Sequence, residues 1–299
     1  MSIATLRLSL AALLAAVLLS PPADSTLQTA ATAPAAQDPA LQKLMEALNE
    51  QGVHLDPVSN ALWVPVRVEV RDELLEYLLV GPAGATHESF FSTRVPASVI
   101  NTALLALGLH AGQNATWRAK DPRPTDEQLR AGAAPYEVTV PQGDALELYV
   151  AWRQKDDVFF YRVEDLLRNL LSGASMQRHR WVYLGSKLLP RDPRQKEAPK
   201  EVFAADVYQN LINIAYFSEA YTLLTAALPE CVEQTIWLPN AWLVPQRGAE
   251  VAFILARGHL DVVPAAFAAQ LPQIDPAARD ARTVVPPGET KTVPPKDGR

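Results

Sequence analysis

Residues 78–113 read LLVGPAGATHESFFSTRVPASVINTALLALGLHAGQ, and they predict a strand, a glycine-containing turn, a second extended piece and a helix. Pro96 fixes φ at a suitable first helical position, and Gly108 stands where a helix ends in a left-handed residue. Between them, apolar residues recur at helical spacing, at Ile100, Leu104 and Leu107. One face of this helix is therefore expected to join the hydrophobic core.

The residues on both sides of this stretch predict strands and hairpins. Four valines alternate with other residues in 64–70, which is the period of a half-buried strand. Residues 74–80 predict a second strand, and the short link at 71–73 indicates an antiparallel hairpin between the two. A further hairpin is expected at 136–152, with its turn at 141–144.

Residues 163–171 predict a second core helix, because apolar side chains fall at i, i+3, i+4, i+7 and i+8, and Gly173 follows as a C-cap. Residues 211–227 are compatible with a strand or with a partly helical structure. Further strands are expected at 158–161, 181–184, 202–207, 211–217 and 251–255, and a last short helix within 258–271. The fold class predicted by these elements is α+β, a largely antiparallel sheet covered by two main helices, with disordered termini.

The amino-terminal residues resemble a secretory signal. Arg7 provides one positive charge, residues 8–19 are apolar, and Pro21-Pro22 precede small residues, so cleavage after Ser25 is expected. A retained membrane anchor is the alternative, but a span needs about 20 apolar residues and this run is shorter. The expected organisation is therefore a signal peptide at 1–25, a flexible tether with a short amphipathic helix at 26–56, a globular domain at 57–273 and a disordered proline-rich tail at 274–299.

Composition and charge exclude several classes of function. The net charge of -6 argues against nucleic acid and anionic membrane surfaces as partners, because both require a basic patch. The basic cluster at 191–200 is interrupted by acidic residues and prolines, which is typical of a solvated loop. With a single cysteine, Cys231, the chain has no internal disulfide and too few thiolates for an iron–sulfur cluster. No cofactor is expected.

His87 and Glu88 are the candidate site residues. A zinc-protease pattern needs a second histidine four residues after the first, and that position is Phe91. A metal site assembled from His87, Glu88 and distant residues such as His54 or His110 stays open. The simpler interpretation is a turn in which both side chains satisfy backbone groups. No catalytic residue is assigned.

Two further motifs have a structural and a functional interpretation. The glycines of 81–84 lack the lysine and hydroxyl residues of a phosphate-binding loop, so they predict a turn. Residues 237–242 read WLPNAW and space two indoles about a ligand's width apart. They are compatible with a groove for a sugar or peptide, but buried aromatic residues are the more common arrangement.

Together, these motifs resemble the YdjY-like family of secreted bacterial domains of unknown function. The resemblance rests on the strand, His-Glu turn and apolar helix of 78–113, on WVYLGS at 181–186, and on Ala205-Asp206 before Asn210-Leu211-Ile212, and it covers roughly 57–257. The family's pattern has a glycine before the Asn-Leu-Ile element, where this chain has Gln209. The resemblance implies a compact extracytoplasmic domain and leaves the activity open.

The sequence thus favours a non-catalytic, exported domain, periplasmic or secreted, that binds a protein or a cell-envelope component. The terminal tethers and the loop at 191–200 are the surfaces that it suggests for this role. No stable membrane span is expected after signal cleavage. The alternative is an enzyme with a site around His87 and Glu88, either metal-assisted or acting by acid–base catalysis.

Overall fold

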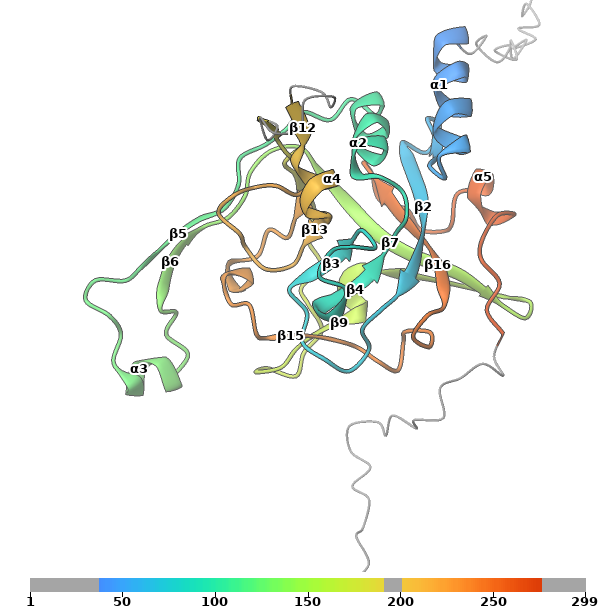
Figure 1. Ribbon diagram of the computed structural model, residues 1–299. Coiled ribbons are helices and arrows are strands. Elements are labelled where there is room, and N and C mark those ends of the chain that lie inside the picture. Colours follow the sequence, from blue (N-terminus) through green and yellow to red (C-terminus); the bar gives the residue numbers. More distant parts are fainter. Residues whose placement is uncertain (1–37, 191–200, 276–299) are drawn as a thin grey trace, which may run out of the picture. The chain divides into compact units, whose positions relative to one another are not determined.

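The computed structural model describes residues 38–190 and 201–275 (Figure 1). The predicted signal peptide, residues 26–37 of the tether, the basic loop at 191–200 and residues 276–299 of the tail lie outside the described residues. Within the described residues, no helix combines the length and the apolar character that a membrane span requires.

The centre of the fold is a closed barrel of eight strands. Neighbouring strands are antiparallel except at two contacts, β13–β14 and β3–β4, which are parallel. The barrel closes because β2 pairs with β16 along one edge and with β4 along the other, where Val68 lies opposite Phe91. In barrel order the strands are β2 (Ala61–Val68), β16 (Glu250–Ala256), β7 (Ala145–Gln154), β10 (Trp181–Tyr183), β14 (Leu224–Thr225), β13 (Asn210–Asn213), β3 (Tyr77–Val80) and β4 (Ser89–Ser92).

The prediction of an α+β sheet covered by two main helices is therefore wrong. The described residues are mostly β, and their five α-helices are short. Strands β2 and β4, the first and last in barrel order, pair with each other and close the sheet into a barrel. The inward apolar side chains therefore pack inside the barrel and need no helices to cover them. The helices are α1 (Pro39–Glu50), α2 (Ala97–Ala106), α3 (Asp126–Arg130), α4 (Ala204–Tyr208) and α5 (Ala265–Ala268).

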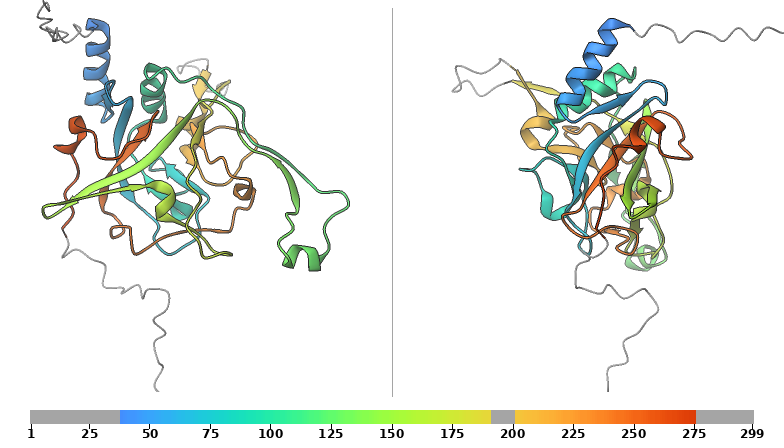
Figure 2. Two further views of the ribbon diagram at one scale, coloured as in Figure 1. Left: turned by 180° about the vertical axis from the view of Figure 1, so that it is seen from behind. Right: turned by 90° about the vertical axis from the view of Figure 1, so that its right-hand side faces the viewer.

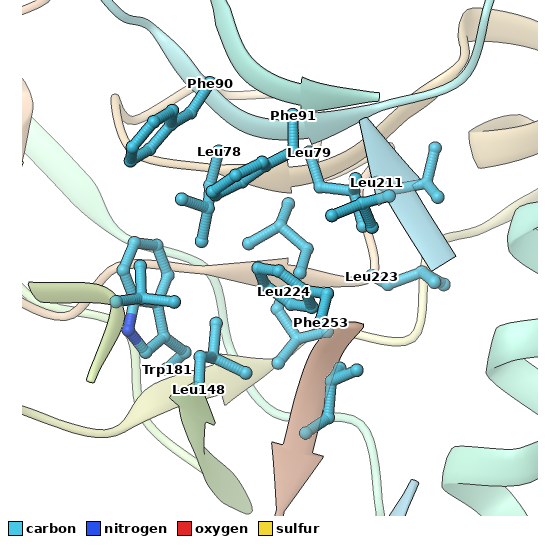
Figure 3. Close-up of a cluster of buried hydrophobic side chains, with 14 of the residues drawn as sticks. Leu78, Leu79, Phe90, Phe91, Leu148, Trp181, Leu211, Leu223, Leu224 and Phe253 are labelled. Carbon is cyan, nitrogen blue, oxygen red and sulfur yellow. The ribbon is translucent and has the colours of Figure 1, made fainter. Parts of the chain in front are cut away.

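The barrel interior is filled by apolar side chains that converge from strands on different sides (Figure 3). Phe91 of β4 meets Phe253 of β16 edge to face, with 5.9 Å between the ring centroids. Trp181 and Leu148 join this cluster from β10 and β7. Each fully buried leucine or phenylalanine contributes about 1.5–3 kcal/mol relative to its exposed state.

A second apolar cluster covers the outside of β2, β16 and β7. It contains Trp63, Ile254 and Tyr149, with Phe267 of α5 packed on them. For this reason β2 is buried on both faces along most of its length, and the half-buried strand inferred from the valine alternation is only partly correct.

The helix predicted at 163–171 is not formed. Val163–Leu166 make one turn of 3-10 helix, η2, and Leu167–Asn169 then form strand β9, which pairs with β15 (Trp237–Pro239). Leu166 and Leu167 are buried, but the side chain of Leu171 is 79% exposed. The main-chain hydrogen bonds between β9 and β15 take the place of the helical hydrogen bonds that the local pattern favoured.

Both predicted hairpins are also wrong. Strand β3 pairs with β13 and β4 instead of β2, and β6 (Tyr136–Thr139) pairs with β5 (Thr116–Ala119) instead of β7. β7 forms its hairpin with β8 (Asp157–Arg162). Residues 202–207 are mostly helix α4 after the short strand β12 (Glu201–Phe203), which pairs with β11 (Leu188–Pro190).

Several local predictions are confirmed. Helix α2 buries Ile100 and Leu104, and Gly108 after it has φ of +76°. Helix α1 forms where the amphipathic segment was expected, and it packs against β1 (His54–Asp56). The predicted strands at 158–161, 181–184 and 251–255 correspond to β8, β10 and β16, and α5 lies within 258–271. Residues 211–227 form no helix.

Candidate functional site

The His87-Glu88 pair lies in an exposed turn. Residues Thr86–Glu88 form one 3-10 turn, η1, between β3 and β4. The turn is held by main-chain bonds, since the Glu88 amide donates to the Ala85 carbonyl and its carbonyl accepts from the Glu76 amide. The His87 side chain is 80% exposed, and its Nε2 lies 3.9 Å from Glu88 Oε2. An exposed pair at this distance stabilises the fold little.

The other histidines considered for a metal site have different neighbours. His54 stacks on Trp63 with 4.2 Å between ring centroids, and burial lowers the pKa of its imidazole. His110 Nδ1 lies 3.2 Å from Asp144 Oδ2 on the surface. Across residues 38–190 and 201–275, no group of three or more histidine, cysteine, aspartate or glutamate side chains is arranged to hold a metal ion.

The side chain of Glu76 interacts electrostatically with both residues of the His87-Glu88 pair. Burial raises the pKa of the Glu76 carboxyl, the nearby Glu88 raises it further, and His87 acts in the opposite direction. The adjacent Tyr77 stacks on Phe217 at 5.1 Å, and burial together with Glu76 raises its pKa to about 12. The turn thus borders a partly buried carboxyl group that holds its proton more tightly than an ordinary glutamate.

The turn at 81–84 is fixed by Gln209. Gln209 adopts the left-handed conformation, with φ of 61°, that the family's glycine would occupy without strain. Its carbonyl accepts from the Gly81 amide at 2.7 Å, and its Oε1 accepts from the Ala83 amide at 3.2 Å. A Cβ atom on Gly81 would lie 2.2 Å from Gln209 Oε1. The tight turn before Asn210 is therefore present although the glycine is not.

A buried polar cluster that sequence analysis missed surrounds Arg162 at the end of β8. The guanidinium donates to both carboxylate oxygens of Glu164, at 3.0 and 2.9 Å, and to Glu147 Oε2 at 2.6 Å. Glu164 also accepts a hydrogen bond of 2.9 Å from the Trp181 indole. Its side chain is 0% exposed. One cation thus compensates two carboxylates in the interior.

The outer end of the cluster reaches the surface at His259. Glu147 Oε2 accepts from the Tyr149 hydroxyl at 2.6 Å and lies 2.9 Å from His259 Nδ1. Burial acts to raise the pKa of Glu147, but hydrogen bonds from Tyr149 and His259 and the charge of Arg162 hold it below its usual value. Burial and the bond to Glu147 raise the pKa of Tyr149 to about 12.

The inner end of the cluster contains His179. Its Nδ1 lies 3.0 Å from the Gln177 carbonyl and 3.8 Å from Glu164 Oε1, and its Nε2 is buried with no hydrogen-bond partner among the described residues. Burial lowers the pKa of the His179 imidazole. A neutral ring is therefore favoured at this position.

The cluster has no sequence motif because its members are spread from Glu147 to His259. The available signal was the presence of charged residues among apolar ones at a spacing of two: Glu147 with Tyr149 on one face of β7, and Arg162 at the end of β8 with Glu164 in η2. The arrangement compensates charge in the interior, and it includes no side chain that we can assign as a nucleophile.

The remaining sequence candidates are placed as follows. Trp237 is buried in the core, whereas Trp242 is exposed, so the two indoles do not line one surface. Cys231 is fully buried, and burial raises the pKa of its thiol, which makes it unreactive.

A long two-stranded arm, residues 113–142, projects from the barrel (Figures 1 and 2). Its base begins at the bridge between Gln113 and Gln142, β5 and β6 continue the ladder, and α3 forms the tip. Helix α3 begins with a capping box between Thr125 and Gln128. From Thr116 to Val140 no residue is buried.

Residues 64–193 match the family model of the YdjY domain. This range includes the arm, the barrel strands β3, β4, β7 and β10, residues 64–68 of β2, and the buried cluster except for His259. No curated protein and no solved structure matches the chain. The match over residues 64–193 supports the resemblance to the YdjY-like family that the sequence motifs indicated.

Proposed function

We propose that this protein is a non-catalytic binding module that holds a protein partner along the arm. The observation that carries the proposal is that residues 116–140 form two paired strands and a helix in which no residue is buried. A two-stranded ribbon is marginally stable by itself in water. A partner that covers the arm would bury the apolar side chains that the barrel leaves partly exposed.

The arm has one apolar and one polar face. Trp117, Tyr136 and Val138 fall on the face that is half-buried, whereas Arg118 and Glu137 fall on the exposed face and form an ion pair with each other. Near the base, Trp117 and Val138 pack against the hydrophobic core, and Trp117 lies 6.1 Å from the ring of Tyr216. Towards the tip, the apolar face is only partly covered.

This composition fits a protein interface better than other surfaces. Tryptophan and tyrosine anchors inside a polar rim are typical of protein–protein contacts. The ribbon between Thr116 and Thr139 has four basic residues, Arg118, Lys120, Arg123 and Arg130, and four acidic residues, Asp121, Asp126, Glu127 and Glu137. Its net charge is zero, so it lacks the basic stripe that binding of nucleic acid requires.

The location of the partner follows from the predicted signal peptide. We infer that the chain is exported and that the arm works in the periplasm or outside the cell. Amino-terminal sequencing of protein from the extracytoplasmic fraction should find a chain that starts at Thr26. Full-length protein in the cytoplasmic fraction would contradict this location.

The proposal is tested by cross-linking in the native host. A photoreactive residue at Glu127, exposed on α3, should cross-link to one protein, whereas the same residue at Val58, exposed in the turn between β1 and β2, should not. The captured protein is then purified and tested against a variant in which a two-residue turn replaces residues 119–136. Loss of binding supports the proposal. Identical cross-links at both positions, or unchanged binding by the shortened protein, would contradict it.

A further inference from the structure

The closed barrel leaves one long strand with a free edge, β8. It pairs with β7 only, and the described residues show no main-chain hydrogen bond from its other edge to a further segment. Arg153 of β7 lies opposite Val158, yet its amide and carbonyl bond to Pro272 and Ile274 on the other side. By antiparallel alternation, the amide and carbonyl groups of Val158, Phe160 and Arg162 point away from β7.

This edge lacks the protection that other outer strands have. Asp157 and Arg162 lie at the two ends of β8, but its four middle residues, 158–161, read VFFY and include no charged residue and no proline, and Val158 is 44% exposed. Among the other described outer strands, β5 contains Arg118, β6 contains Glu137, and β1 is short and packed against α1. Soluble proteins protect free edges with charges, prolines or a covering segment. The sequence of β8 is that of a strand which is covered.

The strand is held rigidly for pairing. On one face, Trp152 of β7 stacks on Phe159 at 5.2 Å and lies 5.6 Å from Tyr161. On the other face, Tyr149 stacks on Phe160 at 4.8 Å. These contacts fix the edge before any partner binds, which reduces the entropy lost on pairing.

We propose that β8 pairs antiparallel with β8 of a second copy of this chain, about a two-fold axis at Phe160. In this register Phe160 faces Phe160 of the second copy, Phe159 faces Tyr161, and Val158 faces Arg162. The outward groups of these residues then complete the hydrogen bonds of one continuous sheet. The ten-stranded sheet of each copy thereby extends across the axis.

The sequence of the strand favours its own copy over a foreign strand. The register about Phe160 gives every aromatic residue of β8 an aromatic cross-strand neighbour on the same face, and such pairs contribute about 0.2–1 kcal/mol each. The contact is isologous, so it closes at two copies and builds no fibre. The arm takes no part in it, so this proposal stands or falls separately from the proposed function.

Analytical ultracentrifugation of the purified protein tests the proposal. Wild-type protein should be a dimer at concentrations of tens of micromolar. Val158→Pro removes an outward amide without touching the ladder to β7, and it should weaken association at least tenfold. Val158→Thr keeps the amide and the β-branched shape, and it should remain a dimer. If the proline variant does not fold, Val158→Lys serves instead, because it places a charge in the interface and should also weaken association.

The register has its own readout. Two Phe160→Cys chains would bring their Cα atoms within the distance that a disulfide bridges, so oxidation should yield a covalent dimer. Val158→Cys, which faces Arg162 in this register, should yield none. A wild-type monomer over the whole concentration range would overturn the proposal. A dimer that persists in the proline and lysine variants, or equal cross-linking of both cysteine variants, would overturn it as well.

Discussion

Arg162 is the last residue of β8 and Glu164 lies two residues later in η2, and two hydrogen bonds of 3.0 and 2.9 Å join their charged groups inside the protein. We predict that Glu164→Gln destabilises the fold by about 1–3 kcal/mol, because the amide nitrogen of glutamine cannot accept the hydrogen bond that one carboxylate oxygen of Glu164 receives from the buried guanidinium. Asp165→Asn is the matched control. It breaks the solvent-exposed pair with Arg178, which contributes about 1 kcal/mol or less. Equal losses in urea unfolding would show that the buried pair has no special role.

His179 makes stability depend on pH. Burial lowers the pKa of this imidazole below the value of 6.5 that it has in the unfolded chain. The unfolded state therefore binds the proton first as the pH falls, and the stability contributed by the neutral ring is present above pH 6.5 and lost below it. His179→Gln should reduce the slope of the free energy of unfolding against pH. The interval to measure is about pH 7.5 to 5.5, because it brackets the ordinary histidine pKa of 6.5. An unchanged slope in His179→Gln would contradict this account.

Leu166 and Leu171 distinguish the observed structure from the helix that the sequence suggested. In such a helix both residues would lie on one buried face, but only Leu166 is buried here. Leu166→Ala should therefore cost about 2–5 kcal/mol and Leu171→Ala less than about 0.5 kcal/mol in chemical unfolding. Similar costs at both positions would favour the helix.

Gly81 and Gln209 should show coupled energetics. Gly81→Ala places a methyl group against the Gln209 side chain, so it should destabilise the protein by about 1–3 kcal/mol. Combined with Gln209→Gly, which removes that side chain and tolerates the left-handed φ, the alanine should cost much less. Additive losses in the double variant would mean that the two residues do not share this contact.

Local patterns predicted the elements whose structure is decided by near neighbours. Helix α2 has its proline start, apolar spacing and glycine end within a single segment. The strands β8 and β16 each contain a continuous apolar run that is rich in β-branched or aromatic residues. In each case the residues that determine the element are adjacent in the chain.

The barrel and the buried cluster depend on distant pairs instead. Closure requires Val68 to lie opposite Phe91, and η2 and β9 replace a helix because Leu167 lies opposite Pro239. Periodicity does not contain this information, because a strand and a helix can bury the same short apolar run. Likewise, Glu147 and His259 meet only after β7 and β16 have paired.

The central claim is that the arm binds a protein partner. The most direct test is to measure the affinity of the captured partner for two single variants of the arm. Tyr136→Ala removes an anchor from the apolar face, and Thr139→Ala removes a side chain from the polar face. We predict that Tyr136→Ala raises the Kd at least tenfold and that Thr139→Ala changes it less than twofold, with both variants folded. Equal Kd values for wild-type protein and Tyr136→Ala would contradict the claim.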